Sequence, residues 1–157
     1  MERPGLHEHW KLSTVLDLHD TMAITGCIVF ANTRERVDWL QTKLVGAQCS
    51  AVSIHSGMPQ ELRMESLRKF RPREASVLIT TDVCSRGIDM PHCVLSISYD
   101  TPRSRETYLH RVGRAGRYGR KAISLLLVKR DEVPIMRDME QFFSTDITEA
   151  PLEIVGA

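Results

Sequence analysis

Residues 28–45 read IVFANTRERVDWLQTKLV, a short apolar run followed directly by an amphipathic one. The first three residues are β-branched or aromatic, which is typical of a buried strand. In the remainder, apolar residues recur three and four positions apart, the spacing of one helical face. Thr33 stands where a side chain caps the start of a helix. A strand followed by a helix is the repeating unit of an α/β fold.

The same alternation continues on both sides of this unit. Four further apolar runs predict strands, at residues 51–54, 76–79, 94–98 and 125–128. Amphipathic patterns predict helices at residues 10–22, 59–70, 104–112 and 131–143. Continuous apolar runs indicate strands that are covered on both faces. Because strands and helices alternate, we expect right-handed crossovers and a mainly parallel sheet.

The composition is that of one globular domain of 157 residues, with 42% hydrophobic and 26% charged residues. A net charge of +1 excludes a histone-like wrapper, so any nucleic-acid binding must come from a local basic patch. The four cysteines have no C-x-x-C or metal-ligand spacing, so we expect reduced thiols and no metal site. The sequence shows no secretory signal and no apolar run of membrane-spanning length, and we expect a cytoplasmic or nuclear protein.

Residues 110–117 read HRVGRAGR and place three arginines three residues apart, with two glycines between them. Planar guanidinium groups bind phosphate oxygens in a bidentate manner, and glycines let the backbone approach a ligand closely. Between Arg103 and Lys121 the only acidic residue is Glu106. We therefore favour a polyphosphate ligand, while a solvated or salt-bridged surface turn remains the alternative.

Polar groups follow several of the predicted strands. Ligands of parallel sheets bind at the carboxyl ends of the strands. We expect the candidate loops at this edge, namely residues 32–34, 55–57, 80–82 and the arginine segment.

Individual side chains in these loops suit a phosphorylated ligand. Gln60 and Arg63, three residues apart near a helix start, can reach one phosphodiester, although a polar surface helix is the plainer interpretation. A threonine hydroxyl can donate to a phosphate, whereas Asp89 suits sugar hydroxyls. Alternatively, Asp82 and Asp89 cap helices or pair with Arg86.

Two nucleotide-binding features are missing from the sequence. It has no G-x-x-x-x-G-K-[ST] phosphate loop, and no paired acidic motif at a strand end that could hold magnesium. The chain thus has arginines suited to a phosphoryl-transfer transition state but no cradle for the nucleotide.

Taken together, these segments resemble the second RecA-like domain of DEAD-box RNA helicases, from about Trp10 to Pro151. The resemblance rests on residues 28–34 (motif IV), 60–63 (Q-x-x-R), 80–89 (motif V) and 110–117 (motif VI). Residues 10–12, 37–40, 117–121 and 143–145 look closest to the translation-initiation-factor-four-A group, which includes the paralogue at the core of the exon junction complex. The resemblance implies a RecA-like three-layer α/β/α sandwich with a mainly parallel sheet. It implies one such domain over residues 1–157, and an N-terminal ATP-cradling RecA-like domain absent from this chain.

The resemblance also implies roles for single residues. Arg114 and Arg117 would be arginine fingers that reach the γ-phosphate of ATP held by the N-terminal domain, together with Mg²⁺. His110 would lie beside them, near the attacking water. Gly87 and Asp89 would contact the ATP ribose.

RNA contacts are implied for a second set of residues, namely Gln60, Arg63, Thr81, Gly57, Asn32 and Thr33. The chain departs from the family at two places that bear on these sites. Ser56-Gly57 stands where relatives commonly carry Gly-Asp, and Cys84-Ser85 stands where the group usually has Trp-Ala.

We therefore expect the carboxy-terminal lobe of an ATP-dependent RNA helicase, inactive as a fragment and RNA-stimulated as a full-length enzyme. The expected partners are single-stranded RNA bound through its backbone, the N-terminal domain, and a helical-repeat scaffold of translation initiation or exon junction complexes. We expect a monomer that acts in translation initiation or mRNA processing. Two alternatives remain open: a protein-docking module without activity, and a helicase of a sister family that acts on DNA.

Overall fold

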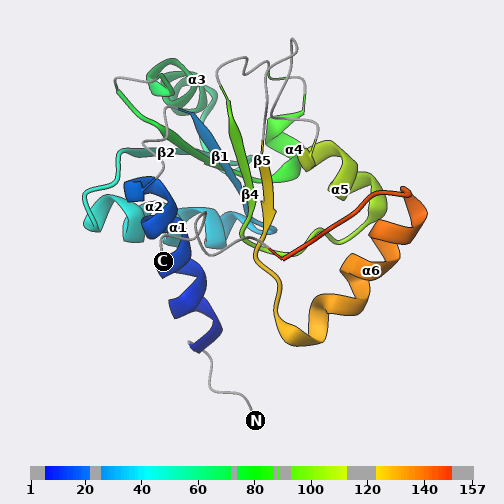
Figure 1. Cartoon of the computed structure of the whole chain (residues 1–157). Coiled ribbons are helices and arrows are strands. Elements are labelled where there is room, and N and C mark those ends of the chain that lie inside the picture. The colour runs from blue at the N-terminus through cyan, green and yellow to red at the C-terminus, as the bar shows by residue number, and fades with distance from the viewer. Residues whose placement is uncertain are drawn as a thin grey trace.

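The computed structural model describes residues 6–21, 26–71, 74–86, 88, 93–112 and 123–149. A five-stranded sheet lies at its centre, with strand order β2-β3-β1-β4-β5 and every neighbouring pair parallel (Figure 1). The strands are β1 (Cys27–Phe30), β2 (Ala51–Ile54), β3 (Val77–Thr80), β4 (Leu95–Ser98) and β5 (Ile123–Leu126). The helices are α1 (Leu6–Thr21), α2 (Arg34–Gly46), α3 (Gln60–Lys69), α4 (Asp82–Ser85), α5 (Arg105–Val112) and α6 (Val133–Phe142), with a 3₁₀ turn η2 (Arg130–Glu132).

Helices α1 and α2 cover one face of the sheet (Figure 1). Val15 and Leu18 of α1 and Leu40 and Leu44 of α2 are buried against alternate strand residues such as Val29. Thr33 caps α2 as expected, because its side chain accepts a hydrogen bond of 3.1 Å from the Arg36 backbone N–H.

The opposite face is covered by residues from α3 and α4. Phe30 and Leu78 point to this side, where Phe70 after α3 and Cys84 of α4 pack against the sheet. Strands β1, β3 and β4 are buried along their whole length, which explains why they read as unbroken apolar runs. The structure thus confirms the expected RecA-like three-layer α/β sandwich.

Strand β5 differs from the prediction for residues 125–128. It begins two residues earlier, because Ile123 pairs with Leu95 of β4. It is an edge strand with a half-exposed surface, so the expectation of a strand covered on both faces is wrong for β5. Its outward side packs instead beside α5 and α6, where Tyr108, Met136 and Met139 form a separate small core.

Two other features were not predicted. Helix α4 is one turn long, too short to show helical periodicity. Lys11 is buried in α1, and its Nζ donates to the Tyr99 carbonyl oxygen over 2.8 Å. Burial lowers the pKa of Lys11 from its ordinary value. Among the described helices, none is both long enough and apolar enough to cross a membrane.

Candidate functional site

A buried ion pair joins α4 to the end of α5. Arg111 is 1% exposed, and its Nε and NH2 donate to Oδ1 and Oδ2 of Asp82 over 2.7 and 2.9 Å. The side chain of Asp82 is 18% exposed, so the pair is screened little by solvent. This geometry is the two-bonded fork that makes an arginine–carboxylate contact specific in direction.

The same guanidinium group reaches two other loops. Its NH1 donates to the backbone carbonyl of Asp100 and its NH2 donates to Oδ1 of Asn32, each at a distance of 2.5 Å. Asn32 in turn donates through its backbone N–H to Oδ2 of Asp100 and through Nδ2 to the Thr101 carbonyl. Arg111 thereby ties together the turns that follow β1, β3 and β4.

His110, the residue before this arginine, contacts α4 as well. Its Nε2 lies 2.8 Å from Oγ of Ser85, and its ring meets the Phe30 ring edge-on with centroids 6.3 Å apart. The Ser85 hydroxyl also donates to the Asp82 carbonyl over 2.9 Å. One helical turn, α4, therefore holds both His110 and Arg111 at the start of the arginine segment.

A second polar cluster lies in the turn after β2. Nε2 of His55 is 2.9 Å from Oδ1 of Asp38, and Nδ1 accepts a 3.0 Å hydrogen bond from the Gly57 backbone N–H. Gly57 packs closely, because a Cβ atom there would lie 3.1 Å from the His55 ring and 3.4 Å from Cδ of Arg34. The turns after β1 and β2 therefore touch.

The strand register brings the predicted RNA-contact loops to one edge. Thr80 pairs with Phe30 on one side and with Ile54 on the other, so the residues that follow leave the sheet at the same level. Thr81 is half-buried and its hydroxyl does not cap α4. On the neighbouring α3, Gln60 is exposed at the start of the helix.

Arg63 lies one turn further along α3 and is half-buried. Its Nε is buried and has no hydrogen-bond partner in the described part of the chain. A buried donor without an acceptor is unfavourable, so an anion that allowed this side chain to move outward would stabilise it.

Asn32 is placed differently from the other predicted contacts. Its amide nitrogen and oxygen are both engaged inside the domain, with Thr101 and Arg111. Thr33 and Arg34 are the exposed side chains of this turn. The turn therefore presents a hydroxyl and a guanidinium group to solvent.

Four of the predicted site residues lie outside the described residues, namely Gly87, Asp89, Arg114 and Arg117. The arginine segment joins α5 to the amino end of β5, so it does not follow a strand as the other loops do. Of its described residues, the buried Arg111 side chain reaches the carboxyl edge of the sheet. For this first arginine the salt-bridged alternative holds instead of a phosphate ligand, because Arg111 is buried and paired with Asp82; only the solvated form of that alternative is wrong for it.

The partner of Asp82 also differs from the alternative drawn from the sequence. Asp82 pairs with Arg111, whereas Arg86 lies 3.8 Å from Glu106. Thr81 occupies the N-cap position of α4, and Asp82 is the first residue of the helix. Asp82 is therefore neither a cap nor a partner of Arg86.

The comparison with protein families gives one clear match. The family described as Helicase conserved C-terminal domain matches residues 10–119, more than half of the chain. The chain belongs to this family.

Solved structures narrow the assignment of this helicase domain. It is 28% identical to Saccharomyces cerevisiae Dbp5 bound to RNA and ADP BeF3, with a TM-score of 0.81 over 89% of this chain and 38% of that one. It is 32% identical to Escherichia coli DEAD-box protein SrmB, crystallised with the regulator of ribonuclease activity A, with a TM-score of 0.79 over 92% and 86% of the two chains. It is also similar to the C-terminal domain of the DEAD-box protein Dbp5, with 28% identity, a TM-score of 0.80, and 92% and 87% covered.

These matches confirm a helicase C-terminal domain of the DEAD-box kind. The present chain spans 38% of the length of the Dbp5 chain that was solved with RNA and ADP BeF3. They do not separate the translation-initiation-factor-four-A group from other DEAD-box proteins, so that assignment stays a prediction.

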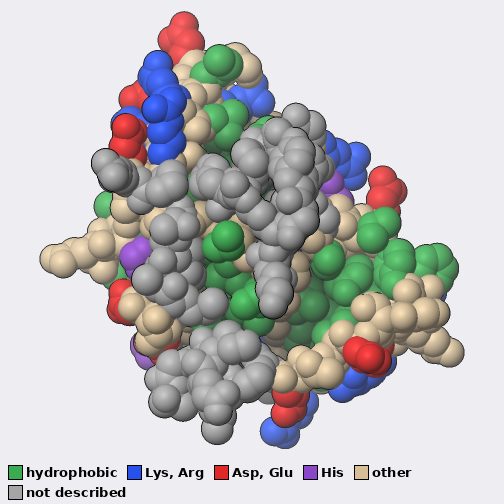
Figure 2. Space-filling model, turned by 45° about the horizontal axis from the view of Figure 1, so that its top comes forward, with side chains coloured by type: hydrophobic (Ala, Val, Ile, Leu, Met, Phe, Trp, Pro, Cys, Tyr) green, Lys and Arg blue, Asp and Glu red, His purple; other side chains and the backbone are tan. Residues whose placement is uncertain are grey.

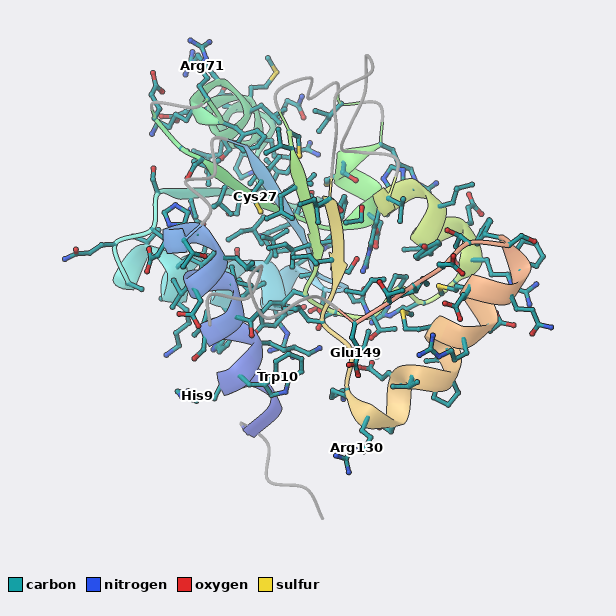
Figure 3. The ribbon with its side chains drawn as sticks, in the orientation of Figure 1. His9, Trp10, Cys27, Arg71, Arg130 and Glu149 are labelled. Atoms are coloured by element: carbon teal, nitrogen blue, oxygen red, sulfur yellow. The ribbon has the colours of Figure 1, made fainter. Side chains whose placement is uncertain are left out.

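An apolar groove of about 570 Å³ lies between α1, β5, α6 and residues 147–149 of this helicase domain. Trp10 and Glu149 line it from two distant parts of the chain (Figure 3). In Figure 2, hydrophobic side chains gather on the side where α5 and α6 lie. The groove shares no lining residue with the cluster around Arg111.

The cysteines of the helicase domain are free thiols. Burial raises the pKa of Cys49 and of Cys93 to about 11, and that of Cys27 well above its ordinary value. Across the described residues, no three His, Cys, Asp or Glu side chains lie close enough to hold a metal ion.

Sequence reasoning missed Asp100 and Ser85 of the Arg111 cluster, and it grouped Arg111 with the phosphate-binding arginines, whereas Arg111 pairs with Asp82. Asp100 follows a buried strand just as Asp82 does, and that parallel was a usable signal. Ser85 and Arg111 carried no such signal, because their contacts join residues 25 and 29 positions apart.

Proposed function

We propose that this helicase domain is the C-terminal lobe of an ATP-dependent DEAD-box RNA helicase. An N-terminal lobe would hold ATP and Mg²⁺, and this domain would complete the site when the two lobes close. The observation that carries the proposal is the grip of α4 on His110 and Arg111, which anchors the chain immediately before Arg114 and Arg117. The similarity to Dbp5, whose structure was solved bound to RNA and ADP BeF3, supports it by analogy.

In this proposal Arg114 and Arg117 reach the γ-phosphate as arginine fingers. Phosphoryl transfer requires positioning and charge stabilisation more than covalent chemistry, and an arginine finger contributes roughly 10³–10⁵ in rate. Such a contribution requires a fixed backbone before the fingers, which the buried Asp82–Arg111 pair supplies. Gly87 and Asp89 would contact the ribose of the same nucleotide.

RNA would bind along the carboxyl edge of β1, β2 and β3. Thr81, Gln60 and Arg63 would hold phosphates there. The Gly57 backbone would lie against the RNA, and the exposed Thr33 would add a hydroxyl. Contacts to phosphate alone are independent of base sequence. RNA that spans both lobes would favour the closed state and so couple RNA binding to hydrolysis.

Asn32 has a supporting role in this arrangement. Because both polar atoms of its side chain bind within the domain, it shapes the turn and leaves the RNA contact to Thr33 and Arg34. A function in translation initiation or mRNA processing, with a helical-repeat scaffold as partner, is the pathway we propose. Structures of relatives of this domain have been determined bound to Gle1 and to the regulator of ribonuclease activity A, which supports a protein partner.

The decisive experiment uses the two-lobe protein. Arg114→Ala should lower RNA-stimulated ATP turnover roughly 10³–10⁵-fold while single-stranded RNA is still bound. Arg130→Ala is the matched control, because Arg130 is exposed on η2 and points away from the molecule (Figure 3). Unchanged turnover in Arg114→Ala would contradict the finger role.

Two further arms separate the alternatives. Stimulation by single-stranded DNA as strong as by RNA would indicate the sister-family helicase. Partner binding without any ATP turnover in the two-lobe protein would indicate the docking module. The present chain alone should hydrolyse essentially no ATP.

A further inference from the structure

The hydroxyl group of Ser85, a buried residue of α4, makes two short contacts. Ser85 is 0% exposed. Its Oγ lies 2.9 Å from the Asp82 carbonyl oxygen and 2.8 Å from Nε2 of His110. Both distances are those of real hydrogen bonds.

A hydroxyl carries one hydrogen, which decides the direction of both bonds. The Asp82 carbonyl can only accept, so the Ser85 hydrogen points to it. The contact with His110 must then run the other way, with Nε2–H as donor and the serine oxygen as acceptor. If Ser85 donated to His110 instead, two oxygen lone pairs would face each other across 2.9 Å.

We propose that Ser85 is a positioning residue that holds the His110 imidazole in the Nε2–H form and in one orientation. The Phe30 ring flanks the imidazole edge-on, so its orientation is fixed from two sides. Asp82 completes the device, because its carbonyl binds Ser85 while its carboxylate binds Arg111. The ring of His110 and the guanidinium group of Arg111 are thereby held by the same helical turn.

In this tautomer the neutral imidazole carries its proton on Nε2 and none on Nδ1. The consequence for catalysis rests on the proposed function, in which His110 lies near the attacking water. A ring released from Ser85 would sample other orientations, so turnover would fall while RNA affinity stayed the same.

The test is made first on this chain with ¹⁵N-labelled histidine, and it needs no variant. Long-range proton–nitrogen spectra should show the His110 proton on Nε2. A proton on Nδ1 with bare Nε2 would overturn the proposal, because Ser85 would then be the donor. This readout involves no nucleotide, so it stands whether or not the proposed function holds.

Variants then test the contact itself. In Ser85→Ala the Nε2–H signal of His110 should broaden or disappear through exchange with water, while it persists in Ser53→Ala. Ser53 is a matched control, since it is equally buried and its hydroxyl also binds one side chain, Oε1 of Gln41. An unchanged Nε2–H signal in Ser85→Ala would overturn the proposal.

Kinetics of the two-lobe protein give the last readout. Ser85→Ala should lower kcat by up to about tenfold, the effect of one hydrogen bond, with the RNA KM unchanged. Equal changes in kcat and KM, or a loss shared by Ser53→Ala, would show a merely structural role. Absence of RNA-stimulated turnover in the unmodified protein would instead count against the proposed function.

Discussion

Arg111 and Asp82 form a two-bonded ion pair across 29 residues of sequence, and the guanidinium group is almost completely buried. Removing one partner of such a pair leaves an uncompensated charge in the interior, which is more costly than losing the attraction itself. The pair therefore matters for stability mainly because neither half tolerates the absence of the other.

Asp82→Ala should destabilise this chain by about 3–5 kcal/mol, because Arg111 would stay charged and lose its main acceptor. Urea denaturation monitored by circular dichroism measures the free energy of unfolding. Arg111→Lys should also be costly, since a single ammonium group cannot replace the fork that reaches Asp82, Asp100 and Asn32. A loss below about 1 kcal/mol in Asp82→Ala would contradict the burial of the pair.

Substitution by alanine should have different effects at two glycines of the chain. At Gly57 an added Cβ would lie 3.1 Å from the His55 ring, so Gly57→Ala should displace the ring and weaken the Gly57–His55 hydrogen bond. The RNA affinity of the two-lobe protein should fall by up to about tenfold. At Gly46, near the end of α2, an added Cβ meets nothing within 4 Å.

Gly46→Ala should therefore stabilise the chain by about 0.5–1 kcal/mol and leave RNA affinity unchanged. Fluorescence anisotropy with labelled single-stranded RNA and thermal unfolding separate the two outcomes. Equal effects of both substitutions would argue against a tight turn at Gly57.

Buried thiols predict a loss of stability at alkaline pH. Burial raises the pKa of Cys93 to about 11, whereas the unfolded chain ionises near the ordinary value of 9.0. Between these pH values the folded state binds the proton more tightly, so the free energy of unfolding falls as pH rises. Across this pH range the thiol lowers the free energy of unfolding by an amount on the order of 2 kcal/mol.

Cys93→Ala should flatten this pH dependence, as measured by urea denaturation between pH 8 and 11. The cavity left by the substitution lowers stability at every pH, so the slope rather than the absolute value is compared. A slope identical to that of the unmodified chain would show that Cys93 ionises freely when folded.

The surface pair of Arg105 and Asp138 should behave differently from the buried one. Its two hydrogen bonds, of 3.0 and 2.8 Å, are also of the fork type, but both side chains are about half exposed. The hydrogen bond from Arg105 lowers the pKa of Asp138 below its ordinary value. Its stabilising effect is therefore present above that ordinary value and is lost as pH falls through the lowered one.

Asp138→Asn should thus have a much smaller effect than Asp82→Ala, and high salt should remove most of it. Denaturation at low and high ionic strength measures this difference. Arg105 also lies 4.0 Å from the Phe142 ring centroid, a contact that Asp138→Asn leaves in place. A salt-insensitive effect of the size seen at Asp82 would contradict this explanation.

The fold could be predicted because most of its strands are buried on both faces. β1, β3 and β4 have unbroken apolar runs, and the Thr33 cap marks the start of α2. The edge strand β5 was displaced by two residues, because its position depends on pairing with β4 rather than on its own composition. α4 was missed because a single turn has no period.

The site was predictable as a set of loops but not as a network. Residue types and their places after strands pointed to the loops at residues 32–34, 55–57 and 80–82, the last of which begins one residue later because Thr80 ends β3. The contacts of Arg111 could not be inferred from the sequence. An arginine that is buried in an ion pair and an exposed arginine that binds phosphate have the same local sequence pattern. The burial of Lys11 could not be predicted for a related reason, because its acceptor, the Tyr99 carbonyl, lies 88 residues away in the sequence.

That separation has a consequence for synthesis in the cell. At 5–20 residues per second, a ribosome takes roughly 4–18 s to produce the acceptor after the lysine has been made. During this interval α1 has an ammonium group in the middle of the surface that it will later bury. Helix α1 of this domain therefore keeps a charged, hydrated group on its packing face until Tyr99, after the fourth strand, has been made, and we expect it to dock late.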